Sequence, residues 1–177
     1  LSNIGARSKV FILEGKSGRS ESLDVQIRVL RAMGVEIQML DSDRAWERMQ
    51  VQMRFADAVI DGLLGTGFSG QLRPSALRLI RLINSAGKPV IAIDVPSGVD
   101  ADTGQIGEAA IKAVCTVALG LPKVGHYICP GASLAGEVLI DDIGLPSQLL
   151  SNDIHQTLID DELAITLMPE RPRDVHK

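Results

Sequence analysis

One carboxylate follows an apolar run at a point where an enzyme could use it. Residues 90–93 (VIAI) predict a short buried strand, and Pro96 and Gly98 end it at once. Asp94 therefore stands at the carboxyl end of a strand. In open α/β sheets ligands bind at this edge, because the loops leave a crevice there and helix N-termini point amide groups into it. Asp94 is thus the first candidate for a catalytic residue.

A second loop combines an acid with several glycines. The apolar segment 57–64 contains Asp61 and runs into Gly65, Thr66, Gly67, Phe68, Ser69, Gly70 and Gln71. The glycines allow positive φ and close backbone approach, so the loop amides could hold a phosphate ahead of the helix expected from Pro74. The loop lacks the Gly-Lys-Ser/Thr of a nucleotide P-loop and is not a dinucleotide fingerprint in a first strand-helix unit. By itself it indicates little, because glycine-rich turns between a strand and a helix are usually only turns.

The two loops together favour an oxygen-lined site. Each follows a neighbouring strand and each contains an acid. Asp61, Ser97 and backbone carbonyls would supply the oxygen ligands that suit a hard cation. A purely structural alternative stays open, because an Asp before a Pro-Ser-Gly turn can simply accept backbone amides, and Asp100 and Asp102 can be solvated.

The histidines, one lysine and the cysteines carry less information. The three histidines show no metal-ligand spacing, so surface or packing roles are expected, although His126 in LPKVGHY could line a ligand crevice. Lys123, in the same stretch, is expected to be solvated rather than a phosphate ligand. Cys115 and Cys129 show neither metal-ligand spacing nor a disulfide framework, which predicts buried thiols in a reducing cytoplasm.

The composition is ordinary for a globular domain. The 177 residues suffice for one sizeable core, with 45% hydrophobic and 23% charged residues. A net charge of −4 and a pI near 5.4 give no electrostatic reason to expect nucleic-acid or anionic-membrane binding. There is no run of about 18 apolar residues and no signal-peptide pattern. A cytoplasmic protein is expected.

Alternating strand and helix patterns must position the candidate residues. Strands are predicted at 9–13, 35–40, 57–64 and 90–93, and helices at about 20–34, 41–55 and 74–86. The first helix, for example, places Leu23, Ile27 and Leu30 on one face. Strands that alternate with helices in this way pair in parallel through right-handed crossovers. The predicted fold class is α/β, a three-layer α/β/α sandwich with a Rossmann-like, mostly parallel sheet.

The pattern changes after residue 105. The segments 109–123, 125–131 (GHYICPG) and 136–144 are short apolar runs between Gly/Pro turns. They predict further strands that extend one edge of the sheet, the last of them antiparallel. From residue 149 onward the apolar runs thin out and the end is rich in Pro and Arg. We expect one domain over residues 1–150 and a linker or tail over 151–177.

Three segments also carry a resemblance to a known family. They are DAVIDGLLGTGFSG (57–70), KPVIAIDVPSGVDADTGQ (88–105) and TVALGLPKVGHYICPGASLAGEVLIDDIGLP (116–146). In this order and spacing they resemble the NAD(P)H-hydrate epimerase family, also known as the YjeF N-terminal domain. The resemblance covers roughly residues 5–148, and its middle segment is quite specific.

The resemblance implies an isomerase that interconverts the R and S forms of hydrated NADH and NADPH. The position matching Asp94 is then the catalytic and substrate-binding carboxylate, the loop matching residues 65–71 binds substrate, and Asp61 and Ser97 help to bind a potassium ion. The chemistry agrees, because the hydrated carbon bears both an oxygen and the ring nitrogen. One carboxylate that takes and returns a proton can assist opening and re-closure on either face. The implied partners are the small-molecule substrate, a second copy of the chain and a fused dehydratase domain.

The sequence departs from that family at both ends. The family has an upstream strand ending in a Gly-Asn-Asn-Gly-Gly-Asp-Gly loop that binds substrate and ion, and this stretch does not occur here. Residues 171–177 (RPRDVHK) resemble the opening of the ATP- or ADP-dependent hydrate dehydratase domain that is often fused to the epimerase. The chain thus resembles the middle of a two-domain repair enzyme.

Two other classes stay open, and the departure leads to a structural prediction. The alternatives are a ligand-binding or scaffold relative that has lost the chemistry, and an unrelated doubly wound enzyme such as a phosphate-handling hydrolase. In the family, the upstream strand lies between the strands expected at 9–13 and 57–64. Each unpaired buried backbone group would cost about 1–3 kcal/mol. We therefore predict that a segment outside these residues fills this place, or that the two flanking strands close onto each other.

Overall fold

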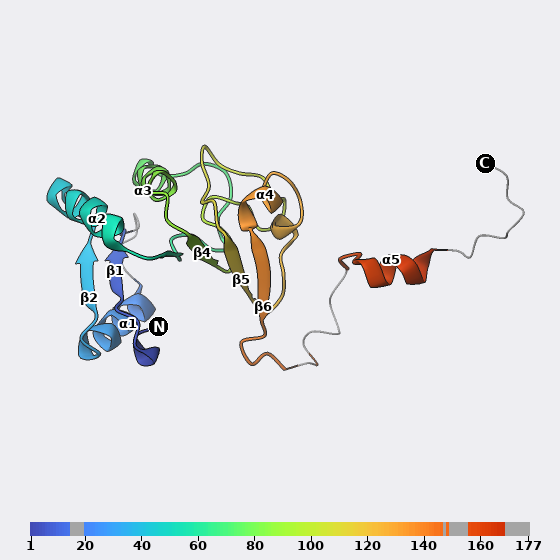
Figure 1. Ribbon diagram of the computed structural model, residues 1–177, viewed down its shortest axis with the longest axis horizontal. Coiled ribbons are helices and arrows are strands. Elements are labelled where there is room, and N and C mark those ends of the chain that lie inside the picture. Colours follow the sequence, from blue (N-terminus) through green and yellow to red (C-terminus); the bar gives the residue numbers. More distant parts are fainter. Residues whose placement is uncertain (15–19, 147, 149–155, 169–177) are drawn as a thin grey trace, which may run out of the picture. The chain divides into compact units, whose positions relative to one another are not determined.

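The computed structural model describes residues 1–14, 20–146, 148 and 156–168. Its elements alternate between strands and helices over the first hundred residues (Figure 1). In chain order they are η1 (Ser2–Ile4), β1 (Lys9–Ile12), α1 (Glu21–Ala32), β2 (Glu36–Met39), α2 (Asp43–Phe55), β3 (Val59–Asp61), α3 (Pro74–Ser85), β4 (Val90–Ile93), β5 (Cys115–Leu119), η2 (Val124–His126), α4 (Ala132–Ala135), β6 (Glu137–Asp141) and α5 (Asp161–Leu167). Residues 15–19, between the first predicted strand and helix, and much of the expected linker or tail at 151–177 lie outside the described residues.

The chain divides into two compact units, Leu1–Ile143 and Gly144–Lys177. The first holds every element up to β6. The second holds α5, whose N-terminus is capped by the Asp160 side chain, which accepts a hydrogen bond from the Leu163 amide. The assignment of residues 151–177 as a linker remains a prediction. Over the described ranges, no helix combines the length and the apolar character needed to cross a membrane.

The strands form two parallel sheets. β1 pairs with β2, and β3, β4, β5 and β6 form a four-stranded sheet in that order, with every neighbouring pair parallel. This confirms the α/β class with a Rossmann-like parallel arrangement. β1 and β3 are not paired with each other, so the second of the two predicted alternatives, that the flanking strands close onto each other, is wrong. The first alternative, a segment outside these residues, stays a prediction.

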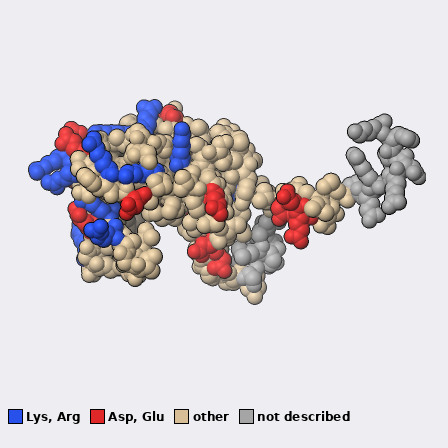
Figure 2. Space-filling model, in the orientation of Figure 1, with Lys and Arg blue, Asp and Glu red and all other residues tan. Residues whose placement is uncertain are grey.

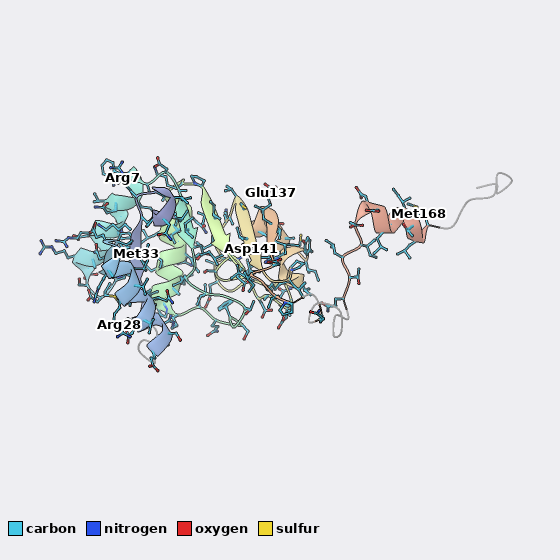
Figure 3. The ribbon with its side chains drawn as sticks, turned by 90° about the horizontal axis from the view of Figure 1, so that it is seen from below. Arg7, Arg28, Met33, Glu137, Asp141 and Met168 are labelled. Carbon is cyan, nitrogen blue, oxygen red and sulfur yellow. The ribbon has the colours of Figure 1, made fainter. Side chains whose placement is uncertain are left out.

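Two details of the predicted sheet edge are also wrong. β6 runs parallel to β5, not antiparallel, and Figure 3 labels its terminal residues Glu137 and Asp141. The segment 125–131 is not a strand, because the chain forms the 3-10 helix η2 and then turns. A Cβ on Gly125 would lie 2.5 Å from the Asp100 carbonyl oxygen, so this segment packs tightly against the loop after β4 and cannot extend as a ladder.

The predicted helices form, and their ends are set by capping residues. Ser20 and Ser42 cap α1 and α2 by accepting hydrogen bonds from the backbone amides of Leu23 and Ala45. α3 begins with Pro74, whose missing N–H is no loss at the first helical position. Gly87, just beyond α3, adopts a left-handed φ of 65°, which suits a residue that ends a helix.

One apolar core joins the two sheets. Its buried members come mainly from α2, α3 and β4: Trp46, Met49, Met53, Ala76, Leu79, Ile80, Ile83, Val90 and Ile111. Phe11 of β1 and Val59 of β3 pack against the same cluster. On the other face of the four-stranded sheet, Ile60, Ile93 and Leu139 are 41%, 41% and 48% exposed. The core therefore fixes α3 against one face of the sheet whose strand ends carry the candidate residues.

Basic side chains gather over α2 and α3 in the view of Figure 2. The arginines of these helices include Arg44 and Arg48 of α2 and Arg78 and Arg81 of α3. The Arg78 guanidinium stacks on the Trp46 ring, with its carbon 4.4 Å from the ring centroid. None of the predicted site residues lies on these helices, so this basic surface is separate from the candidate site.

Candidate active site

Asp61 and Asp94 stand at the same edge of the four-stranded sheet. β3 ends at Asp61, and Asp94 follows the last residue of β4. The two strands are parallel, with Asp61 opposite Ala92. The carboxyl ends of parallel strands meet at one edge, so the structure brings together the two loops that the sequence singled out.

Asp61 and Ser97 form a buried pair that is joined by two hydrogen bonds. Asp61 Oδ1 accepts hydrogen bonds from the Ser97 hydroxyl (2.7 Å) and the Leu63 amide (3.2 Å), and Oδ2 accepts one from the Ser97 amide (2.8 Å). The Ser97 hydroxyl oxygen accepts a hydrogen bond from the Leu64 amide at 2.8 Å and lies 3.3 Å from the Leu64 carbonyl oxygen. Asp61 and Ser97 are only 2% and 1% exposed.

Burial sets the electrostatics of this pair. It raises the pKa of the Asp61 carboxyl, and the hydrogen bonds from Ser97 and Leu63 oppose that rise without cancelling it. The ionised carboxylate is therefore held at a cost in free energy. Carboxylate, hydroxyl and carbonyl oxygens lie together here, and oxygen atoms of these kinds are suitable ligands for a hard cation. Within the described ranges, no group of three or more His, Cys, Asp or Glu residues is arranged to hold a metal ion.

The backbone at Asp94 is strained. Its φ is 69°, in the left-handed region that non-glycine residues rarely adopt. The Val95 amide donates to the Ile93 carbonyl at 2.9 Å, which closes a three-residue γ-turn around Asp94. The Asp94 amide donates to the Val117 carbonyl of β5 at 2.8 Å, which ties the turn to the neighbouring strand. Such strain persists only where surrounding contacts enforce it, and it is typical of functional sites.

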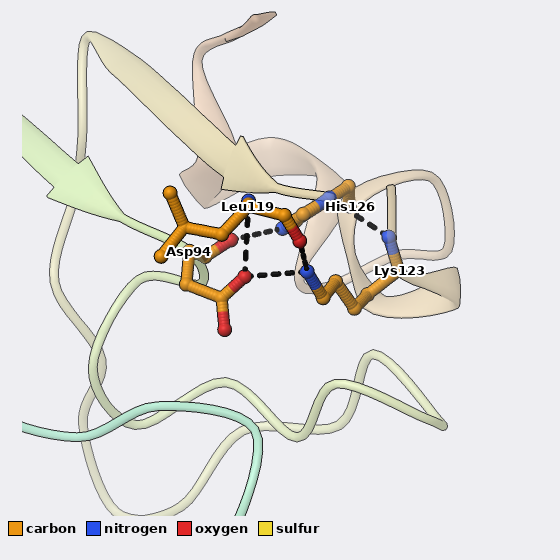
Figure 4. A network of polar contacts seen from close by, with 4 residues as sticks. All are labelled: Asp94, Leu119, Lys123 and His126. Carbon is orange, nitrogen blue, oxygen red and sulfur yellow. Dashed lines mark hydrogen bonds and ion pairs between the residues drawn. The ribbon is translucent and has the colours of Figure 1, made fainter. Parts of the chain in front are cut away.

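One oxygen of the Asp94 carboxylate is fixed by two donors (Figure 4). Oδ1 accepts hydrogen bonds from the Leu119 amide at 3.2 Å and from the Lys123 ammonium at 2.5 Å. Lys123 Nζ also donates to the Leu119 carbonyl at 2.7 Å. No hydrogen bond between described residues uses Oδ2. The described side chains include no buried polar atom without a partner, so Oδ2 faces solvent.

His126 supports the same turn from the other side. Its Nδ1 accepts a hydrogen bond from the Lys123 amide at 3.1 Å, so Nε2 carries the ring hydrogen and donates to the Asp94 carbonyl at 2.8 Å. The side chain is 3% exposed. Burial and the nearby Lys123 charge lower the pKa of His126, while the hydrogen bond to the Asp94 carbonyl and the Asp94 charge act against that change. His126 is therefore a neutral imidazole that holds the γ-turn.

The glycine-rich loop lies beside the segment that follows the Asp94 loop. Residues 65–71 are exposed apart from the half-buried Phe68. A Cβ on Gly107 would lie 3.3 Å from both the Phe68 ring and the Gly70 carbonyl oxygen, and the Leu72 amide donates to Glu108. No hydrogen bond of the described residues joins this loop to the Asp94 side chain. The Asp61 and Ser97 side chains bond to each other and to the loop after β3, whereas the Asp94 side chain bonds to the end of β5.

Sequence reasoning misjudged the residues of the 123–129 segment. The prediction that Lys123 is solvated is wrong, because its side chain is 19% exposed and is paired with Asp94. The prediction of a strand at His126 is also wrong, because this residue lies in η2. The prediction of two buried thiols does not hold either, because Cys129 is exposed and Cys115 is half-buried. The sequence around Lys123 carries no local signal of this pairing, because its partner Asp94 lies 29 residues earlier in the chain.

Comparisons with known proteins find related sequences. Residues 1–125 match the family model described as YjeF-related protein N-terminus. The chain is 35% identical over 177 residues to the bifunctional NAD(P)H-hydrate repair enzyme Nnr of Thermofilum pendens, which covers 100% of this chain and 33% of the relative. It is 29% identical over 169 residues to the NAD(P)H-hydrate epimerase of Weissella koreensis, covering 84% of this chain and 75% of that protein.

A solved structure shares the fold. The crystal structure of the yeast protein ynu0 (YNL200c) superposes with a TM-score of 0.60 at 22% identity, over 70% of this chain and 50% of the yeast chain. The chain spans about a third of the length of the bifunctional relatives that it matches from end to end. The matched family model covers more than two-thirds of the sequence, including both candidate loops, Asp94 and Lys123. The chain belongs to the YjeF-related N-terminal family.

Proposed function

We propose that the full-length protein is an NAD(P)H-hydrate epimerase, which interconverts the R and S forms of hydrated NADH and NADPH. The observation that carries the proposal is the Asp94 carboxylate. It sits on a strained γ-turn at the carboxyl edge of a parallel sheet, with Oδ1 fixed and Oδ2 open to solvent. Relatives named as epimerases and as bifunctional repair enzymes support the same substrate class.

The proposed mechanism uses Asp94 as a general base and acid. The hydrated ring carbon bears a hydroxyl and the ring nitrogen. Asp94 takes the hydroxyl proton as the carbon–nitrogen bond opens, a carbonyl forms, and the electron pair of the broken bond stays on nitrogen within the conjugated ring system. Re-closure on the other face reverses these changes, and Asp94 returns the proton to the oxygen. The configuration of the carbon is thereby inverted.

In this proposal the remaining candidate residues bind the substrate and a potassium ion. The exposed loop of residues 65–71 would hold the substrate through its backbone amides, apart from the Phe68 amide, which donates to the Gly65 carbonyl. Asp61 and Ser97 would hold a potassium ion, which supplies a positive charge beside the substrate when it is bound. The oxygen donors and the unfavourable burial of the Asp61 carboxylate support this assignment.

The proposal extends to the partners of the full-length protein. A dehydratase domain fused after the epimerase is supported by the two bifunctional relatives that match this chain over its whole length. We also assign a cytoplasmic location and a homodimeric state, for which light scattering of the full-length protein is the test of assembly.

The first prediction is that Asp94→Asn abolishes epimerisation without unfolding the protein. Asn keeps the size of the side chain but cannot accept the proton, so a loss of about 10²-fold or more in rate is expected. The measurement follows the decay of one hydrate epimer after an enzyme removes the other. The control is Asp102→Asn, an exposed acid eight residues along the same loop. A rate for Asp94→Asn within a few-fold of the wild type would rule out Asp94 as the acid and base, whereas a wild type without activity would leave an inactive binding or scaffold protein as the better description.

A further inference from the structure

Lys123 and Leu119 form a closed ring of polar contacts with Asp94 (Figure 4). The Leu119 amide and the Lys123 ammonium both donate to Asp94 Oδ1, and the same ammonium donates to the Leu119 carbonyl. Leu119 ends β5, so the lysine is tied both to the carboxylate and to the end of a central strand. The side chains of Lys123 and Asp94 are 19% and 18% exposed, which is unusual for a lysine with only a surface role.

A carboxylate has little intrinsic preference about its last torsion. The terminal rotation of an Asp side chain is broad, so a free Asp94 would present either oxygen to a bound molecule in turn. Two donors from one segment remove that freedom, because they take Oδ1 and leave only Oδ2 facing solvent. The rate of a catalysed reaction depends on how closely the reacting atoms are placed, and small displacements of these atoms lower the rate by large factors.

We propose that Lys123 is a positioning residue that fixes the Asp94 carboxylate, so that Oδ2 is the oxygen that exchanges the proton with the substrate. The assignment rests on the proposed epimerase function for its kinetic consequence. The role of Lys123 in orienting Asp94 does not depend on that function, because the orientation of Asp94 can be measured without substrate.

The test compares Lys123→Met with Lys112→Met in the full-length protein. Lys112 is an exposed lysine eleven residues before Lys123. Methionine keeps the length of the lysine stem and removes the charge. A misplaced general base lowers kcat, so Lys123→Met is expected to lower kcat by about 10²-fold with KM within about threefold of the wild type. Lys112→Met should keep both constants within about twofold of the wild type, as expected for a surface change. Lys123→Gln serves in the same way if the methionine variant does not fold.

A second readout does not need activity. The amide proton resonance of Leu119 in the wild type is expected to carry the downfield shift of a hydrogen bond to a carboxylate. It should move upfield in Lys123→Met and in Asp94→Asn, and stay in place in Lys112→Met. These shifts would support the positioning role even if the protein had no epimerase activity. The lack of activity would refute only the proposed function.

Two results would overturn the inference. If kcat of Lys123→Met stays within about twofold of the wild type, the residue positions nothing that the reaction uses. If kcat falls while the Leu119 resonance stays in place, Lys123 acts by contacting the substrate and not by holding Asp94. A rise in KM with an unchanged kcat would point to the same contact role and would equally refute the positioning role.

Discussion

Asp61 is a buried carboxylate whose lost hydration is only partly replaced by hydrogen bonds. Its carboxylate accepts three hydrogen bonds, yet burial still raises its pKa. A buried carboxylate has lost its hydration, and neutral donors such as an amide and a hydroxyl replace only part of it. A positive ion among the oxygens of Asp61, Ser97 and Leu64 would restore the rest.

Potassium is therefore expected to stabilise the full-length protein. A ligand that binds only the folded state at ten times its Kd contributes about 1.4 kcal/mol, which raises Tm by roughly 3–5 °C for a domain of this size. The measurement is Tm in potassium chloride against choline chloride at equal ionic strength. Ser97→Ala removes one oxygen and should abolish the difference. Equal melting temperatures of the wild type in the two salts would contradict a cation site here.

Residue types and spacing identified Asp61, Ser97 and Asp94 as candidates that the sheet brings to one edge, but they could not identify Lys123. Each of the three candidates lies in or just after an apolar strand pattern, and such a pattern predicts the sheet edge near which a residue lies. Lys123 lies 29 residues beyond Asp94, in a loop whose path depends on glycine contacts with another loop. Its pairing is therefore a tertiary result with no local signature. A lysine in a loop is solvated by default, and only the folded chain shows otherwise.

At the scale of elements, the apolar periodicity predicted every helix from α1 to α3 and the strands between them. The later elements could not be predicted as well. Strand direction in β6 depends on how the connection crosses the sheet, and apolar spacing does not encode this. The segment 125–131 is apolar enough for a strand, but Gly131 and Gly125 lie so close that a Cβ on the former would sit 2.4 Å from the carbonyl oxygen of the latter. Close backbone approach of this kind forces a compact turn.

His126 joins two of these elements, because it lies in η2 and donates to the Asp94 carbonyl after β4. The groups that face it are the Lys123 amide, the Lys123 ammonium and the Asp94 carboxylate. Protonation would place a hydrogen on Nδ1, where the Lys123 amide already donates, so the two donors would face each other. The neutral ring is therefore the form that holds the γ-turn.

The protein is expected to lose stability in mild acid through His126. Its pKa in the folded state lies below the ordinary value of 6.5, so the unfolded chain takes up the proton first as the pH falls. The contribution of His126 to the free energy of unfolding is complete above about pH 6.5 and declines below it. Each kcal/mol lost lowers Tm by about 2–4 °C. The fall in Tm between pH 7.5 and pH 5.5 should be smaller in His126→Gln, which cannot titrate. Equal falls would show that His126 does not contribute.

At the scale of the whole molecule, the four-stranded sheet and the β1–β2 pair share a core but no strand pairing. Phe11 of β1 and Val59 of β3 pack on the same apolar cluster, yet the described residues contain no ladder between their strands. Two strands on either side of an unfilled strand position would lie roughly 10 Å apart, and each facing edge would leave a row of backbone donors and acceptors unpaired. At about 1–3 kcal/mol for each buried group, several of them would remove much of the roughly 5–15 kcal/mol that stabilises a domain.

We therefore expect that, in the full-length protein, a segment outside these 177 residues pairs with both β1 and β3. Hydrogen exchange tests this, because paired amides of a central strand exchange far more slowly than those of an edge. β4 and β5 are central in the four-stranded sheet, and β6 lies at its edge, so the molecule carries its own reference for both cases. The amides of β1 and β3 should be protected as strongly as those of β4 and β5. If both strands instead exchange as quickly as the unpaired amides of β6, no strand occupies the place between them.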